Sequence, residues 1–207
     1  MKKRLLTGLL AAALASASAP VWAADLSLSF RDSAGAPLEF AVATAAPVGK
    51  ATSAKPGKAV VDQVDREFVP YVSVVSVGSE VSFPNQDDIR HSVYSFSPAK
   101  RFELKLYSGT KAAPVVFDKP GVVALGCNIH DWMLAYVYVT EAPYYGRSDA
   151  KGALTLKGLE PGEYELHLWH PDASQGEQVK RLRVEAAGAQ LSQSFSLKPK
   201  PTGAAHQ

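Results

Sequence analysis

The sequence predicts an all-β protein, and two kinds of observation support this. Short runs of alternating apolar and polar residues recur along the chain, as in "LSLSF", "EVSF", "VVALGC", "LAYVYV" and "YELHLW". Groups of Gly, Pro and Asp separate these runs, for example at residues 32–35, 119–121 and 160–162. Alternation with a period of two puts the apolar residues on one face of a strand. Short strands divided by frequent turns are typical of β-sandwiches.

Residues 1–23 precede the first of these strands and predict a secretory signal peptide. Lys2, Lys3 and Arg4 come before the apolar stretch 5–19, and a Val-x-Ala sequence ends at Ala23. This order of basic, apolar and small residues is typical of a cleaved leader. An N-terminal membrane anchor is the less favoured alternative, because the apolar stretch is short for a bilayer. We expect a periplasmic protein with no membrane insertion after removal of the signal.

The charge of the chain is close to balanced, with 22 basic residues against 20 acidic ones. Three of the basic residues lie in the predicted signal peptide, so the mature part is slightly acidic. Nucleic-acid or anionic-membrane binding requires a basic excess, and we therefore predict no nucleic-acid partner. The chain has one cysteine, which excludes an internal disulfide. A free thiol in an oxidising compartment calls for a specific role.

The first and last strand-rich segments are similar to parts of one known fold. The segment "LSLSFRDSAGAPLEFAVATAAP" has a strand, an Asp-x-x-Gly turn and a second strand, and "SDAKGALTLKGLEPGEYELHLWHP" continues the pattern. Together they resemble the carboxypeptidase regulatory-like (transthyretin-like) β-sandwich. The resemblance implies a sandwich split by an insertion, which is tolerated because domain termini often lie close together. The alternative is two tandem sandwiches with an extra N-terminal hairpin.

Composition shifts at residues 46–60 and near Pro143 set the expected domain boundaries. After the signal peptide, 1–23, we expect the first hairpin of the split sandwich and a linker over 24–60. The inserted domain covers 61–143, the rest of the outer sandwich 144–197, and a disordered tail 198–207.

The inserted domain contains the residues that indicate chemistry. The loop "GCNIHDWM" holds Cys127, His130 and Met133, and His91 lies in the upstream segment "PNQDDIRHSV". A thiolate, two imidazoles and a weak thioether form a soft nitrogen–sulfur set that suits copper. One loop between adjacent strands supplies three of these groups, and His91 must come from another strand. Metal ligation would also protect the unpaired thiol from oxidation.

At these residues the chain resembles the cupredoxins, the small blue copper proteins such as amicyanin and plastocyanin. The resemblance rests on Cys-x-x-His-x-x-Met, on "FVPYVSVVSVGSEVSFPNQDDIRHSV" and on "FDKPGVVALGCNIH". It implies a Greek-key cupredoxin sandwich, here combined with a second small β-sandwich. It also implies one type 1 copper ion, with His91, Cys127 and His130 as equatorial ligands and Met133 as the axial one. By the same resemblance, the protein would carry single electrons to or from a c-type cytochrome or a quinoprotein dehydrogenase.

Two positions depart from the family pattern. Ser92 follows His91 where cupredoxins often have an asparagine that tethers the ligand loop, and Asn85 is a candidate substitute. Asp131 follows His130 where the family often has proline. A carboxylate beside a copper ligand would favour the oxidised ion and lower the reduction potential.

Other functions remain open at this point. The main alternative is a periplasmic copper carrier or assembly factor that does not cycle between oxidation states, and a purely structural adhesion module is another. An enzyme with Cys127 as nucleophile is not predicted, since no oxyanion cradle or orienting acid is recognisable. His167 and His170 are three residues apart on an expected strand and would face opposite sides, so we expect structural roles. We interpret the acids in "SEVSFPNQDD" and "VDQVDRE" as solvated loop residues, and Trp132 as either a packed aromatic or part of a docking surface.

Overall fold

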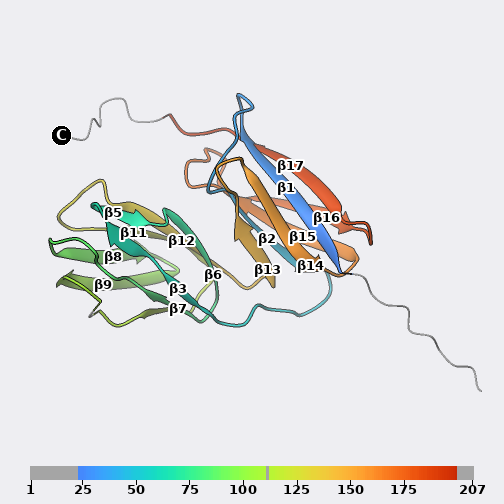
Figure 1. The fold of residues 1–207 in the computed structure, drawn as a ribbon. Helices are drawn as coiled ribbons and strands as arrows, with labels where there is room; N and C mark the ends of the chain where they lie inside the picture. The colour runs from blue at the N-terminus through green and yellow to red at the C-terminus, as the bar shows by residue number, and fades with distance from the viewer. Residues whose placement is uncertain (1–22, 111, 200–207) are drawn as a thin grey trace, which may run out of the picture.

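The computed structural model describes residues 23–110 and 112–199, and within these residues every regular element is a β-strand. The predicted all-β class is confirmed. The strands form two bodies that lie side by side (Figure 1). We call them the outer sandwich, built from strands near both ends of the chain, and the central sandwich, built from residues 58–140. Residues 1–22 of the predicted signal peptide and 200–207 of the predicted tail lie outside the described residues.

The outer sandwich brings the first strands next to the last ones. A three-stranded sheet has the order β14-β1-β17, and a four-stranded sheet has the order β13-β2-β15-β16. β1 runs antiparallel to β14 and parallel to β17, so the N-terminal strand lies between two C-terminal strands (Figure 1). The bounds are β1 (Ala24–Asp32), β2 (Val42–Pro47), β13 (Tyr144–Arg147), β14 (Ala153–Leu159), β15 (Gly162–Trp169), β16 (Gln178–Val184) and β17 (Ala189–Phe195).

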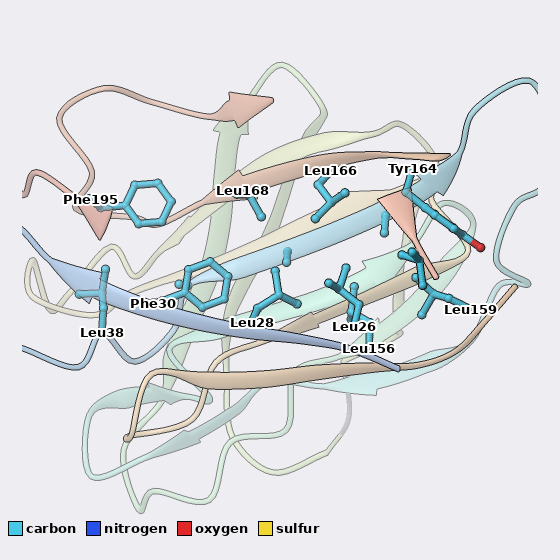
Figure 2. Packing of buried hydrophobic residues seen from close by; sticks show 14 of the residues in the cluster. Leu26, Leu28, Phe30, Leu38, Leu156, Leu159, Tyr164, Leu166, Leu168 and Phe195 are labelled. Carbon is cyan, nitrogen blue, oxygen red and sulfur yellow. The ribbon is translucent and has the colours of Figure 1, made fainter. Parts of the chain in front are cut away.

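The core of the outer sandwich follows from the alternation of its strands. Leu26, Leu28 and Phe30 of β1 are buried, whereas the serines between them face outward. They meet Leu166 and Leu168 of β15 across the space between the two sheets (Figure 2). Because a shift of one residue would turn all these side chains to solvent, the apolar pattern fixes the register of β1.

The central sandwich contains the remaining strands. A five-stranded sheet has the order β6-β12-β11-β8-β9, a three-stranded sheet has the order β10-β7-β3, and β4 and β5 form a separate hairpin. Its core is a second cluster of buried side chains that includes Val81, Phe83, Phe117 and Val137. The bounds are β3 (Lys58–Val60), β4 (Asp62–Val64), β5 (Glu67–Val69), β6 (Val72–Ser76), β7 (Ser79–Ser82), β8 (His91–Ser97), β9 (Lys100–Tyr107), β10 (Val115–Phe117), β11 (Gly121–Gly126) and β12 (Leu134–Thr140).

An aromatic cluster joins the two sandwiches. Trp169, at the end of β15, lies 5.5 Å from the ring of Tyr136 and 5.8 Å from that of Tyr138 on β12. Phe40 of the outer sandwich packs edge-on against Tyr71, with ring centroids 5.4 Å apart. The Tyr138 hydroxyl also donates a hydrogen bond to the Glu177 carboxylate. Rings in these geometries attract one another beyond their burial alone, so the interface contributes to stability.

The exact domain boundaries and the likeness of the outer sandwich to the carboxypeptidase regulatory-like fold stay predictions. Among residues 23–110 and 112–199, no helix is long and apolar enough to cross a membrane.

Candidate metal centre

The central sandwich brings two distant chain segments together at one end of its five-stranded sheet. His91 is the first residue of β8, and Cys127 directly follows β11. Gly126, the last residue of β11, pairs with Tyr94 of β8 on one side and with Leu134 of β12 on the other. The loop between β11 and β12 therefore lies next to the start of β8. Cys127, the last residue of the predicted strand "VVALGC", lies one residue beyond the end of β11, and such a difference is common at strand ends.

The side chains of His91, Cys127 and His130 converge there. One ligand atom from each of the three lies within 4.8 Å of the others, and within the described residues this is the only such group of histidine, cysteine or acidic side chains. The Nδ1 atom of His91 is 3.9 Å from Cys127 Sγ. His91 is fully buried and Cys127 is 3% exposed. His130 is half-buried. Two imidazoles and one thiol match the donor set preferred by copper or zinc.

One ring nitrogen of His130 has no hydrogen-bond partner. Its Nδ1 atom is buried without a hydrogen-bond partner, a state shared within the described chain only by two glutamine side-chain oxygens, of Gln63 and Gln193. Both glutamines donate hydrogen bonds from Nε2, whereas His130 belongs to the group with His91 and Cys127. Burial, followed by the nearby His91, lowers the pKa of His130. A buried ring nitrogen without a hydrogen-bond partner, on an imidazole whose charged form is disfavoured, is a candidate metal ligand.

Met133 lies in the same loop, with its backbone N–H donating to the His130 carbonyl oxygen at 3.0 Å. It is 2% exposed and belongs to the same buried cluster as Cys127. Both side chains border a cavity of about 430 Å³ that opens between Tyr94, Phe96 and Leu134 on the outer face of the sheet. The structure thus places Met133 beside the group of three, and its role as axial ligand stays a prediction.

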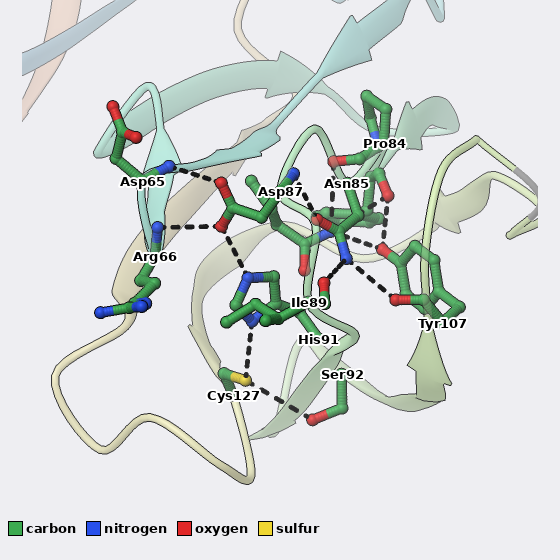
Figure 3. Close-up of polar contacts among 12 residues, drawn as sticks. Asp65, Arg66, Pro84, Asn85, Asp87, Ile89, His91, Ser92, Tyr107 and Cys127 are labelled. Atoms are coloured by element: carbon green, nitrogen blue, oxygen red, sulfur yellow. Dashed lines mark hydrogen bonds and ion pairs between the residues drawn. The ribbon is translucent and has the colours of Figure 1, made fainter.

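Ser92 holds the ligand loop in place of the asparagine that is common in cupredoxins. Its hydroxyl accepts the backbone N–H of Asn128 at 2.9 Å, and it lies 3.8 Å from Cys127 Sγ (Figure 3). The sequence leaves the tether open at this position, and the structure shows that a shorter side chain makes it. The hydroxyl also directs a weak hydrogen bond toward the sulfur, which would withdraw electron density from a thiolate.

Asn85 braces the loop that leads into His91, a different task from that of Ser92. Its side-chain amide donates to the carbonyl oxygens of Ile89 at 2.8 Å and Tyr107 at 2.9 Å (Figure 3). Its side-chain oxygen accepts the N–H of Asp87 at 3.0 Å. Asn85 is 4% exposed, so these bonds are protected from water.

One of the acids that the sequence suggests to be solvated contacts the site. Asp87 Oδ2 lies 2.7 Å from Nε2 of His91, on the side of the ring opposite Cys127 (Figure 3). Its position four residues before His91 is the signal that sequence reasoning missed. Asp131 is exposed and borders the cavity near Cys127.

The other histidines of the described chain lie apart from this group. His167 contacts Glu177 at 2.8 Å, and the Nε2 atom of His170 lies 3.0 Å from the carbonyl oxygen of Glu39. Both have hydrogen-bond partners within the outer sandwich, in agreement with structural roles.

No family model matches the chain, and no curated protein matches it. Among solved structures, it is similar to the copper-containing nitrite reductase NirK of Thermus scotoductus SA-01, with 26% identity and a TM-score of 0.39 over 46% of this chain and 25% of that one. A purple cupredoxin of Nitrosopumilus maritimus shows 21% identity and a TM-score of 0.36, over 40% of this chain and 99% of that one. A variant of amicyanin in its reduced Cu(I) form at pH 4 shows 21% identity and a TM-score of 0.37, over 47% and 99%. The chain thus spans a quarter of the nitrite reductase and nearly all of the two small proteins.

Proposed function

We propose that the central sandwich binds one copper ion in a type 1 site and that the protein carries single electrons in the periplasm. His91, Cys127 and His130 would be the equatorial ligands and Met133 the axial one. The main support for this proposal is that two imidazoles and a thiol from distant segments meet within 4.8 Å of one another, with His91 and Cys127 buried and His130 half-buried. When bound, copper supplies a one-electron redox couple.

The chain's own residues supply rigidity. The strands β8, β11 and β12 are hydrogen-bonded neighbours in one sheet, so the ligand-bearing segments cannot move independently. Ser92 and Asn85 fix the two loops from within. A site that keeps its geometry needs little reorganisation when the ion gains or loses an electron, which favours rapid transfer.

We further propose that a redox partner, a c-type cytochrome or a quinoprotein dehydrogenase, docks near His130. Ile129 and Trp132 flank this histidine in the loop, and each is 48% exposed. The Trp132 ring lies 5.0 Å from the His130 ring. An apolar rim around the ligand closest to solvent supports a transient interface there. Since Cys127 is 3% exposed, we favour an electron carrier over an enzyme with a cysteine nucleophile.

The test is to add Cu(II) to the purified chain and record its visible and EPR spectra. We expect an intense sulfur-to-copper charge-transfer band, which Cys127→Ser should abolish. His130→Gln should weaken or shift the band, whereas the matched control His167→Gln should leave it unchanged, because His167 lies outside the group. A band of full intensity in Cys127→Ser would refute the ligand assignment.

The copper-carrier alternative predicts a different outcome. A carrier would hold Cu(I), show no charge-transfer band, and pass the metal to a copper-free acceptor. Reversible cycling between the two oxidation states without loss of metal would exclude it, and stoichiometric transfer to a competing chelator at each reduction would support it.

A further inference from the structure

The turn of the β4–β5 hairpin forms a cradle for the Asp87 carboxylate. Asp65 and Arg66 connect the two strands and both adopt left-handed backbone conformations, with φ of 53° and 61°. Their consecutive N–H groups point the same way and donate to Asp87, to Oδ1 at 2.7 Å and to Oδ2 at 2.9 Å (Figure 3). Successive backbone N–H groups in such a turn make a concave site that favours an anion.

The protonation state of this carboxylate follows from its contacts. Both of its oxygens accept backbone N–H groups, Oδ1 from Asp65 and Oδ2 from Arg66, which is the bonding expected of an ionised carboxylate. An ionised carboxylate accepts hydrogen bonds and donates none. The His91 Nε2 atom, 2.7 Å away, must therefore carry a hydrogen. In a neutral imidazole this leaves the lone pair on Nδ1, the atom that faces Cys127 at 3.9 Å.

We propose that Asp87 is the positioning residue of the metal centre, holding His91 in the tautomer and orientation that present Nδ1 to the ion. This inference rests on the proposed function and adds a residue to it. The hairpin turn binds Asp87, Asp87 binds His91, and His91 faces the Cys127 thiol. The β4–β5 hairpin therefore fixes the orientation of a metal ligand although it contributes no ligand itself. A carboxylate bonded to a metal-bound imidazole also raises its basicity and stabilises the more highly charged, oxidised ion.

His130 has no comparable arrangement in the described chain. Its Nδ1 atom is buried and unpartnered, and its ring contacts are with His91 and Trp132. The two imidazoles are thus unequal: His91 is oriented by a carboxylate before any ion binds, whereas the His130 ring contacts the rings of His91 and Trp132.

The chain offers three matched variants. Asp87→Asn keeps the shape but supplies one acceptor oxygen where three N–H groups converge, so at least one of them loses its partner. Asp88→Asn removes the same charge from the exposed neighbouring residue. The double variant Asp65→Asn, Arg66→Gly keeps both backbone N–H groups, leaves the net charge unchanged, and uses the residue pair that this two-residue turn prefers.

The first measurement uses the metal-free parent protein and needs no variant. Nitrogen chemical shifts of the His91 ring, recorded at a pH where the ring carries a single hydrogen, should place that hydrogen on Nε2, and it should exchange slowly with water. A hydrogen on Nδ1 would overturn the proposal. Because no copper is involved, this result is independent of the proposed function, which would fail separately if the loaded parent showed no charge-transfer band.

The second measurement compares Cu(II) and Cu(I) affinities, by competition with chelators, and the reduction potential. We expect Asp87→Asn to weaken Cu(II) binding by about 10- to 100-fold, to weaken Cu(I) binding less, and so to raise the potential. Each tenfold difference between the two affinities corresponds to about 59 mV. Asp88→Asn should match the parent, and the double variant should keep the His91 tautomer of the parent, because both backbone N–H groups remain. Equal effects in Asp87→Asn and Asp88→Asn would show a diffuse charge effect, and no effect in Asp87→Asn would show a loop brace only; either result overturns the proposal.

Discussion

The outer and central sandwiches are built by the same rules but differ at one end of the central core. In the described part of the outer sandwich, the buried polar side-chain atoms other than the Gln193 oxygen are paired within the fold. Ser148, for example, donates to the Leu38 carbonyl at 2.7 Å and accepts the Ala41 N–H at 2.9 Å. In the central sandwich the apolar alternation of β11, Val123 and Leu125, continues into a buried thiol that faces two imidazoles.

This difference separates what the fold needs from what a site needs. A row of leucines or valines would fill the end of the central core at less cost than histidines, because a buried imidazole nitrogen without a partner loses its hydrogen bond to water. The central sandwich nevertheless keeps such a nitrogen on His130. Local departures from the rules of stability are expected at functional sites. The outer sandwich does not contain this group of side chains, so its stability can be compared with that of the central sandwich.

The largest expected effect comes from truncating one phenylalanine in each core. Phe117→Ala in the central core and Phe30→Ala in the outer core each remove a fully buried ring, and each should lower the free energy of unfolding by about 3–5 kcal/mol. Urea unfolding would measure both. We expect copper binding to be impaired in Phe117→Ala and retained by the folded fraction of Phe30→Ala. Equal loss of the copper absorption band in both variants would mean that the two sandwiches unfold together as one cooperative unit.

The aromatic interface determines how strongly the two sandwiches are coupled. Trp169→Ala removes the ring that contacts Tyr136 and Tyr138, and we expect a loss of about 3 kcal/mol in unfolding free energy. Unfolding should then occur in two steps, and if copper binds as proposed, the central sandwich should unfold last in its presence. The control Val179→Ala, at an exposed position of the same sandwich, should change stability by less than about 0.5 kcal/mol. A single transition in Trp169→Ala would show that other contacts join the two bodies.

Two glycines, one in each sandwich, allow the effect of adding a single methyl group to be compared. A Cβ atom at Gly126 would lie 2.7 Å from the ring of Tyr94, directly before Cys127, whereas nothing lies within 4 Å of one at Gly162 in the outer sandwich. Gly126→Ala should therefore cost about 1–3 kcal/mol through overpacking and disturb the copper spectrum. Gly162→Ala should be neutral or slightly stabilising, because it restricts the unfolded chain. Thermal unfolding with and without copper would test both.

Local sequence patterns predict the class of fold and the placement of Cys127 and His130 in one loop. The strands at Leu26–Phe30 and Val123–Leu125 are visible as alternation, and the spacing of Cys127 and His130 places them in one loop. Their meeting with His91 depends on which strands become neighbours, which alternation alone does not determine. The resemblance to a known family supplied that step.

The residues that support the site were not predictable in the same way. The β4–β5 hairpin was missed because its turn is Asp65-Arg66 in place of the Asn-Gly that normally marks a two-residue turn. The sequence alone gives Asp87 no role beyond that of an acidic residue in a polar loop. Its partners include two backbone N–H groups, and a sequence does not show which backbone groups a side chain will contact. In the sequence, Ser92 is a departure from the cupredoxin pattern. Its hydrogen bond to the Asn128 N–H depends on the folded geometry, which the sequence pattern does not give.

The smallest expected effect is a dependence of outer-sandwich stability on pH. Burial lowers the pKa of His170 below its usual value of 6.5, although the Glu39 carbonyl acts in the opposite direction. The Asp172 N–H donates to Nδ1 at 3.1 Å, so a proton on that nitrogen would face another donor. The unfolded chain therefore binds the proton more readily than the folded one.

Stability should be at its full value above about pH 6.5 and fall as the pH drops through that range, where carboxylates do not yet titrate. His170→Gln, whose amide can still donate to the Glu39 carbonyl, should flatten the curve of unfolding free energy between about pH 7.5 and 5.5. The metal-free central sandwich contributes a slope of the same sign through His130, and that slope should persist in the variant because burial lowers the pKa of that histidine too. Parallel curves for the parent and His170→Gln would mean that the outer sandwich accommodates the charged imidazole, and the pH dependence would then belong to the central sandwich alone.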